Sequence, residues 1–445
     1  MLAALLALCE PLASRLEAQN APPAAALARR EASDTMRLTI ADARAAALRA
    51  NPELAATRLE TEIARGLLRQ AGVVRFNPSA DVLSAGASGN GLELSVSQEV
   101  EIAGQRGARR AVARAGVARA QFTVADAARL TLADVGRAFY RAVAADRRAA
   151  LATEVLQLNE RLAQVSTRQL REGEISKLDY NLAIVEVGRA RARALAARRE
   201  QQQSVIALRR VTGLPAELPL IAVFDSSVHR HVVLDSLNVP SRTIIVDVGA
   251  PGDATVVQLV ARALAQRPDL AERGAAVAQA EADVSLARRQ ALPNLVTRVL
   301  TAQNAAGTGQ SLRPGVGLSI PLFNRNQGEI ETRRAIARRV VLERSATATL
   351  VRAEVESALR AYEAAAGEVE VLETTVLGPA RDNRRLLEAA YREGKVGLPV
   401  LLLIRNQVID AEQEYWSAWL AERDAIAALT AAVGVGPLPP APEPR

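Results

Sequence analysis

One short sequence motif occurs twice in the chain, each time inside a long stretch that contains almost no helix-breaking residue. Arg171-Glu172-Gly173-Glu174-Ile175 returns 221 positions later (392 − 171) as Arg392-Glu393-Gly394-Lys395-Val396. About 65 residues precede each copy and about 35 follow it. A glycine with left-handed backbone angles can fold a helix back on itself. The repeat therefore predicts two helical hairpins with tips near 173 and 394, whose longer helices would be roughly 100 Å long.

The composition agrees with long helices that pack on one another. Hydrophobic residues make up 49% of the 445 residues, but aromatic residues only 3%. Ala and Leu fill the seams between helices well, whereas compact enzyme cores usually contain more large rings. The sequence has no stretch of 18 apolar residues without a charge, so no membrane-spanning helix is expected and a membrane crossing would need strands.

A second repeated sequence motif lies between the two helices with which each half of the chain begins, here called the entrance helices. Asn51-Pro52-Glu53-Leu54 returns as Arg267-Pro268-Asp269-Leu270, 216 positions later (268 − 52). The residue before a proline avoids helical angles, so each phrase separates two amphipathic helices. The duplication therefore covers the entrances of the two halves as well as their tips.

Between the entrance helices and the long helices, both halves contain a segment that predicts a β-hairpin. Leu92, Leu94 and Val96 alternate with polar residues in the first half, and Val316, Leu318 and Ile320 alternate with small residues in the second. We expect these hairpins at about 79–100 and about 294–321, with strands long enough to cross a bilayer at a tilt. Four strands cannot close a barrel, and open edges are not tolerated in lipid, so several copies must pool their strands. A soluble pair of hairpins beside a coiled coil is the alternative.

The resulting division of the chain has five parts. Residues 1–36 form a signal-like, flexible N-terminus, in which lipidation of Cys9 competes with cleavage after Ala18. The first repeat covers 37–213, a mostly irregular linker 214–253, the second repeat 254–434, and a Pro-rich tail 435–445.

The sequence offers no constellation that favours catalysis. Its only histidines, His229 and His231, lie in the linker, and Cys9 is the only cysteine, so we expect no enzyme activity, no cofactor and no metal site. The net charge is +7. Basic residues alternate with nearly as many acids along the predicted helices, which indicates solvated helix faces and no nucleic-acid partner.

Together these features resemble the TolC family of outer-membrane efflux channels. The resemblance rests on Leu38-Thr39-Ile40 through Asn51-Pro52-Glu53-Leu54, on the doubled order of hairpin and long helix, and on the two glycine tips, and it spans about 37–434. The segments 97–106 and 319–328 are most similar to CzcC-type members, the outer-membrane components of heavy-metal cation exporters.

The resemblance implies a fold that is mainly α with a small β part. Duplicated long antiparallel helical hairpins would form a periplasmic α-barrel, and four strands per chain would contribute to a trimeric, twelve-stranded outer-membrane β-barrel. The implied partners are two further copies of the chain, outer-membrane lipid, a periplasmic adaptor (membrane fusion) protein and an inner-membrane transporter of the RND class. The implied function is a passive duct for heavy-metal cations in the outer membrane of a Gram-negative bacterium. A coiled-coil scaffold without a pore, or a TolC-like channel for drugs or secreted protein, are the alternatives.

The resemblance also places the functional residues at the tips. The gate candidates are Asp179, Tyr391, Lys395, Arg392, Val400 and Leu403. The candidates for docking of the adaptor are Arg171, Glu172, Gly173, Glu174, Ile175, Ser176, Glu393, Gly394, Val396, Gly397 and Leu398. Solvation of the turns is the alternative role for the charged members of these sets.

Overall fold

The computed structural model describes residues 36–84, 92–215, 220–222, 254–303, 310–318 and 321–434. Within these residues the fold is mainly helical, with two long helical hairpins, one four-stranded sheet and one short pair of strands, and this confirms the expected fold class. The possible lipidation site at Cys9, the two histidines of the linker and the Pro-rich tail lie outside the described residues.

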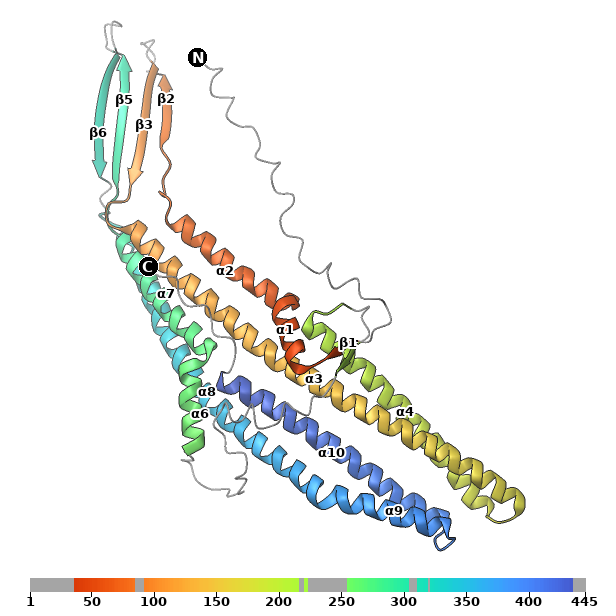
Figure 1. The fold of residues 1–445 in the computed structure, drawn as a ribbon. Coiled ribbons are helices and arrows are strands. Elements are labelled where there is room, and N and C mark those ends of the chain that lie inside the picture. Colours follow the sequence, from red (N-terminus) through yellow and green to blue (C-terminus); the bar gives the residue numbers. More distant parts are fainter. Residues whose placement is uncertain are drawn as a thin grey trace.

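The first helical hairpin consists of α3 (Gln105–Glu172) and α4 (Lys177–Thr212). α3 contains 68 residues without interruption and is therefore about 100 Å long. Its buried positions are mostly alanine and valine, which allow the two helix backbones to lie close together along the whole seam. Figure 1 shows the two helices side by side as far as the turn that joins them.

The second helical hairpin differs from the first because its outgoing helix is interrupted. This helix runs as α8 (Gln327–Val371), a π-helical segment η2 (Leu372–Leu377) and α9 (Gly378–Arg392), and the chain returns as α10 (Leu398–Val433). Gly378 and then Pro379 follow the π segment. A proline inside a helix lacks an N–H donor and collides with the carbonyl four residues earlier, so the preceding turn widens.

Short entrance helices precede each half. They are α1 (Ile40–Ala50) and α2 (Pro52–Ala71) in the first half, and α6 (Ala254–Gln266) and α7 (Pro268–Gln290) in the second. Asn51 separates α1 from α2: its Oδ1 accepts from the Leu54 N–H (2.9 Å), and its Nδ2 donates to the Val211 carbonyl at the end of α4 (2.7 Å). One residue thus starts α2 and caps the helix that returns from the tip.

The four strands between the helices form one antiparallel sheet in the order β2-β3-β5-β6. The strands are β2 (Ser79–Ser84), β3 (Leu92–Val100), β5 (Leu295–Gln303) and β6 (Gln310–Leu318). Val96 lies opposite Val299 on one face, and Ser97 lies opposite Arg298 on the other. The apolar face is exposed in the single chain, including Val82, Leu94, Val96, Val299, Leu312 and Val316. β2 and β6 remain open edges.

Two apolar clusters hold the helical part together where the entrance helices meet the hairpins. One contains Leu38, Ala43 and Ala47 with Phe139 and Leu208, and the other contains Leu259 and Ala263 with Val355, Leu359 and Leu429. In the first cluster Trp419 of α10 packs edge-on against Tyr140 of α3, with ring centres 5.8 Å apart. This contact joins the two hairpins near their bases.

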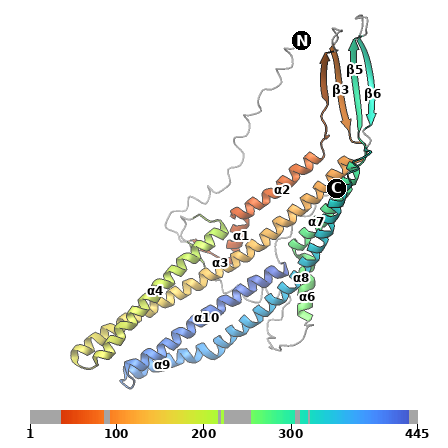
Figure 2. The ribbon, with the colours of Figure 1, turned by 180° about the vertical axis from the view of Figure 1, so that it is seen from behind.

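The sheet and the hairpin tips lie at opposite ends of the molecule (Figures 1 and 2). The short strands β1 (Met36–Leu38) and β4 (Leu220–Ala222) pair in parallel in between. No helix in the described part of the chain is both long enough and apolar enough to cross a membrane.

Candidate functional site

The two hairpin tips share the same backbone geometry. Gly173 and Gly394 adopt left-handed angles, with φ of 78° and 70°. In each case the next residue bonds back to the last helical turn: the Glu174 N–H donates to the Gln169 carbonyl (2.8 Å), and the Lys395 N–H donates to the Ala390 carbonyl (3.0 Å). This is the Schellman arrangement, which satisfies carbonyls at the end of a helix and turns the chain.

The helices that return from the two tips begin differently. In α4 the Asp179 N–H donates to Ser176 Oγ (3.1 Å), and Ser176 Oγ donates to the Asp179 carboxylate (2.7 Å). In α10 the cap is Gly397, which has no side chain, and Pro399 lies in the first turn. Asp179, a gate candidate, therefore also stabilises the start of α4.

Two candidates of the second tip belong to an apolar cluster. Tyr391 and Val396 pack against Leu387, Leu401 and Leu402. The same cluster includes Leu162 of α3 and Ala183 of α4, so it connects the ends of both hairpins. Burial raises the pKa of Tyr391. The phenol therefore stays protonated at neutral pH and can donate a hydrogen bond.

The remaining gate candidates face solvent in the single chain. Lys395 Nζ forms an ion pair with Glu393 of its own tip (2.5 Å), and Arg392 Nε donates to the Glu388 carbonyl (3.2 Å). Val400 and Leu403 are 46% and 60% exposed. Among the described residues no hydrogen bond or ion pair joins Asp179 to Tyr391.

The docking candidates form two exposed turns. Arg171, Glu172, Gly173, Glu174, Ser176, Glu393, Gly394 and Gly397 are exposed, and Ile175 and Val396 are half-buried. The side chain of Leu398 lies outside the described residues. The first tip therefore presents acidic and basic groups together around one half-buried isoleucine.

A buried arginine that sequence reasoning missed lies between the hairpins, behind the tips. Arg405 of α10 is 5% exposed, and its Nη2 donates to the Val155 carbonyl of α3 (3.4 Å). Its Nη1 has no hydrogen-bond partner among the described residues. Burial lowers the pKa of Arg405, against the opposing charge of Glu388. Glu154 and Arg384 line the same cavity of about 20 Å³, which is large enough for one water molecule.

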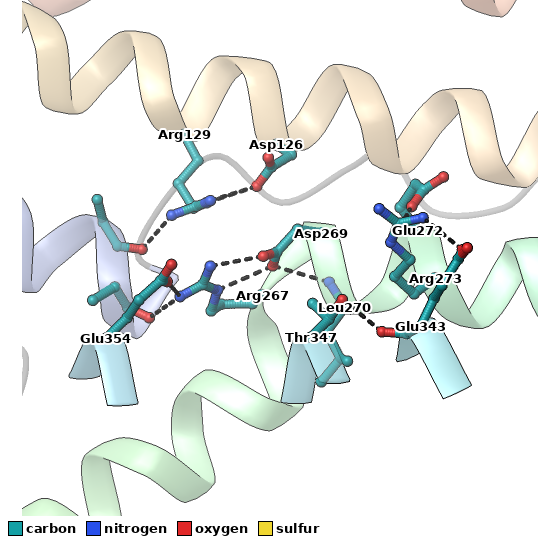
Figure 3. A network of polar contacts seen from close by, with 12 residues as sticks. Asp126, Arg129, Arg267, Asp269, Leu270, Glu272, Arg273, Glu343, Thr347 and Glu354 are labelled. Atoms are coloured by element: carbon teal, nitrogen blue, oxygen red, sulfur yellow. Dashed lines mark hydrogen bonds and ion pairs between the residues drawn. The ribbon is translucent and has the colours of Figure 1, made fainter. Parts of the chain in front are cut away.

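A network of buried polar contacts holds the base of the second hairpin (Figure 3). Arg267 forms two hydrogen bonds to Asp269 (3.0 and 2.7 Å), an ion pair with Glu354 (2.5 Å) and a bond to the Ala432 carbonyl (3.2 Å). Arg129 of α3 donates to the Ala431 carbonyl (2.5 Å). Two cations thus cap the last carbonyls of α10, where the helix dipole favours positive charge.

The carboxylates of this network differ in their pKa. Burial raises the pKa of Asp126, although the nearby Arg129 opposes this effect. Burial acts in the same direction on Asp269, but the hydrogen bonds and charge of Arg267 outweigh it and hold the pKa of Asp269 below its usual value. Arg267 takes the place that Asn51 has in the first half, and the repeated phrase before Pro52 and Pro268 is the sequence signal for both.

The break in the second long helix has its own polar contact. The Tyr415 hydroxyl of α10 donates to Glu373 of η2 (2.9 Å). Burial and the Glu373 carboxylate raise the pKa of Tyr415 to about 12. This bond ties the π segment to the neighbouring helix. In the described part of the chain no group of three or more His, Cys, Asp or Glu side chains is placed to hold a metal ion.

Comparison with known proteins identifies this architecture. The model of the family described as outer membrane efflux protein matches residues 44–214 and 259–435. The chain is 27% identical over 295 residues to the cobalt-zinc-cadmium resistance protein CzcC of Cupriavidus metallidurans, an alignment that covers 66% of this chain. The match spans 65% of the length of that relative.

Solved structures share the fold at low sequence identity. A structure of CusC, from a study of its folding and transmembrane channel formation, has a TM-score of 0.71 and 18% identity, and covers 90% of this chain and 94% of that one. The outer membrane channel CmeC of Campylobacter jejuni has a TM-score of 0.72 and 14% identity, with coverage of 90% and 86%.

Proposed function

This chain belongs to the outer membrane efflux protein family, and we propose that it is the passive outer-membrane duct of a tripartite system that exports heavy-metal cations. It is a TolC-family channel of the outer membrane and is similar to CzcC. A coiled-coil scaffold without a pore does not fit membership of a channel family.

The proposal rests mainly on one observation: the sheet with its apolar face lies at one end of the chain, and the tips of the long helical hairpins lie at the other. The sheet has one apolar face and two open edges, β2 and β6, which suits insertion into lipid together with other copies of the chain. The long hairpins carry the chain far from that sheet (Figure 1). A homotrimer joins three such sheets edge to edge and surrounds a tunnel with the helices.

The tips are the part of the duct that meets the rest of the export system. In this proposal a periplasmic adaptor contacts the exposed turns around Gly173 and Gly394, and an inner-membrane RND pump supplies the energy. Because the tips differ in charge, with Glu174 in the first and Lys395 in the second, a trimer presents six tips of two alternating kinds. An adaptor can recognise that alternation by charge complementarity.

The same tips form the resting gate. The apolar cluster around Tyr391, Leu401 and Leu402 holds the ends of both hairpins together, and Val400 and Leu403 form an apolar constriction in the trimer. Lys395 and Arg392 are bonded within their own tip and are available to a neighbouring copy once those bonds exchange.

The proposed cargo is heavy-metal cations, because the relative CzcC is a cobalt-zinc-cadmium resistance protein. The test is growth of a deletion strain on graded cobalt, zinc and cadmium and on several drugs, with and without the gene restored. Sensitivity to the metals alone supports the proposal. Sensitivity to drugs alone, or a secretion defect, would replace it with a TolC-like channel for drugs or secreted protein.

A further inference from the structure

The positive charge of the chain is concentrated where the helices meet the sheet. The stretches 65–76, 99–114, 281–290 and 325–344, here called the arginine collar, contain 15 arginines and 7 carboxylates. The whole chain has an excess of 7 positive charges, so acids and bases nearly balance outside the collar. All four stretches border the strands, at the ends of α2, α3, α7 and α8 that lie nearest the sheet (Figure 1).

A few collar arginines are occupied by the fold itself. Arg289 donates to the Ala103 carbonyl (3.0 Å), Arg109 pairs with Glu101, and Arg333 pairs with Glu329 (2.6 Å). Others are exposed and form no ion pair with the described residues, namely Arg106, Arg110, Arg114, Arg325 and Arg334. These side chains are available to a ligand outside the chain.

One groove gathers several of these guanidinium groups. Arg288 of α7 and Arg334 and Arg338 of α8 line a groove of about 430 Å³, together with Val284, Ala337 and a single acid, Glu281. A groove with three cations, one anion and an apolar wall suits a phosphate group attached to an apolar body.

Large apolar side chains lie exposed in the short segments that join the sheet to α3 and α8. Phe323 is 92% exposed, and Leu322 and Ile102 are 65% and 54% exposed. Ile102 lies two residues after Val100 and so extends the alternation of the apolar sheet face beyond the end of β3. Exposed aromatic and aliphatic side chains next to arginines are typical of the boundary between acyl chains and headgroups.

We propose that the arginine collar binds anionic phospholipids of the periplasmic leaflet of the outer membrane. The guanidinium groups bind the lipid phosphates through paired hydrogen bonds. Phe323, Leu322 and Ile102 enter the acyl region, which lies on the side of the sheet. Lipid charge then fixes the height of the sheet in the bilayer. This surface lies at the sheet end of the molecule, away from the tips.

The test compares two triple variants of equal charge in the full-length protein. Arg106→Gln/Arg110→Gln/Arg325→Gln removes collar charges, and Arg193→Gln/Arg198→Gln/Arg199→Gln removes exposed charges from α4, far from the sheet. Native mass spectrometry of protein in detergent, titrated with phosphatidylglycerol or phosphatidylcholine, gives the two affinities. We expect the wild type and the α4 variant to prefer phosphatidylglycerol by about tenfold, and the collar variant to lose that preference.

Equal binding of both lipids by the wild type, or an equal loss in both variants, would overturn the proposal. Planar-bilayer conductance of the same samples separates this inference from the proposed function. A protein that prefers the anionic lipid but carries no current, even when Asp179 and Tyr391 are replaced, refutes the duct and leaves the collar standing. A wild type that conducts but shows no lipid preference refutes the lipid-binding collar and supports the duct.

Discussion

At the scale of single residues, Asp179 and Tyr391 hold the tips through different kinds of contact. Asp179 accepts from Ser176 and fixes the start of α4, while Tyr391 fills the apolar cluster that joins the hairpins. Because both residues belong to the proposed resting gate, we expect Asp179→Ala with Tyr391→Phe, which removes their polar groups, to raise single-channel conductance in planar bilayers. Tyr415→Phe, which removes a hydroxyl distant from the tips, is the control. An unchanged conductance would remove both residues from the gate.

Arg267 is the residue on which the base of the second hairpin depends most. Its side chain is 4% exposed, and its removal leaves Asp269, Glu354 and the Ala432 carbonyl without their partner. We expect Arg267→Ala to lower the free energy of unfolding by about 3 kcal/mol. Urea unfolding in detergent measures this change. Arg273→Ala, which removes two surface ion pairs of 3.6 and 3.5 Å (to Glu272 and Glu343), should cost less than about 1 kcal/mol.

The lowered pKa of Asp269 gives the stability a defined dependence on pH. The folded chain binds the proton of Asp269 more weakly than the unfolded chain, so its stabilising effect is complete above about pH 4. That effect disappears as the pH falls through the lower folded pKa. Between pH 5 and pH 3, roughly, the melting temperature of the wild type should fall more steeply than that of Asp269→Asn. Parallel curves for the two proteins would contradict this assignment.

Arg405 and the capping role of Arg267 show what the sequence alone leaves open at this scale. The phrase Arg267-Pro268-Asp269 is visible as the counterpart of Asn51-Pro52-Glu53, but its partner Ala432 is 165 residues away. Arg405 follows an apolar run, Leu401 to Ile404, and only the packing of α3 against α10 decides that it is buried. Contacts between distant segments of this kind depend on the tertiary arrangement and have no local signal.

At the scale of elements, the turns at Gly173 and Gly394 test the hairpin model. Nothing lies within 4 Å of the position where a Cβ would be added at either glycine, so alanine there costs only backbone strain. We expect Gly173→Ala and Gly394→Ala each to destabilise the tip by about 1 kcal/mol. Hydrogen exchange at Glu174 and Lys395, whose N–H groups close the turns, reports this change.

A matched glycine substitution inside α4 of the first hairpin separates the effect of backbone strain from the effect of replacing a glycine as such. Gly188 lies within α4 and also has open space around its missing Cβ, but it has ordinary helical angles. Gly188→Ala should therefore stabilise the protein by about 0.5–1 kcal/mol. A loss of stability at Gly188 similar to that at the tips would show that the left-handed angles are not the cause.

Most elements follow from local patterns, and the exceptions have physical causes. The glycine and proline positions mark the ends of α3, α1 and α6, and the alternation from Leu92 onward marks β3. The π segment η2 was not expected, because Gly378-Pro379 can equally end a helix or widen it. Packing of Leu372 and Val369 against Ala418 of α10 keeps the chain helical through the break.

At the scale of the whole molecule, the sheet and the hairpin tips lie at opposite ends of the chain, and in the proposed duct the sheet enters the membrane while the tips meet the partners. Its excess of positive charge, which the sequence suggested was spread along solvated helix faces, gathers beside the sheet only once the fold brings four separate stretches together. The open edges β2 and β6 are likewise a property of the sheet order and not of any single strand.

The central claim is that copies of this chain assemble into a duct through the outer membrane. Conductance of the purified full-length protein in planar bilayers, together with the mass of the conducting species, tests it most directly. If the protein forms such a duct, the homotrimer gives stepwise currents and the monomer gives none. A protein that fails to insert, or inserts as a trimer without conducting even when Asp179 and Tyr391 are replaced, would contradict it.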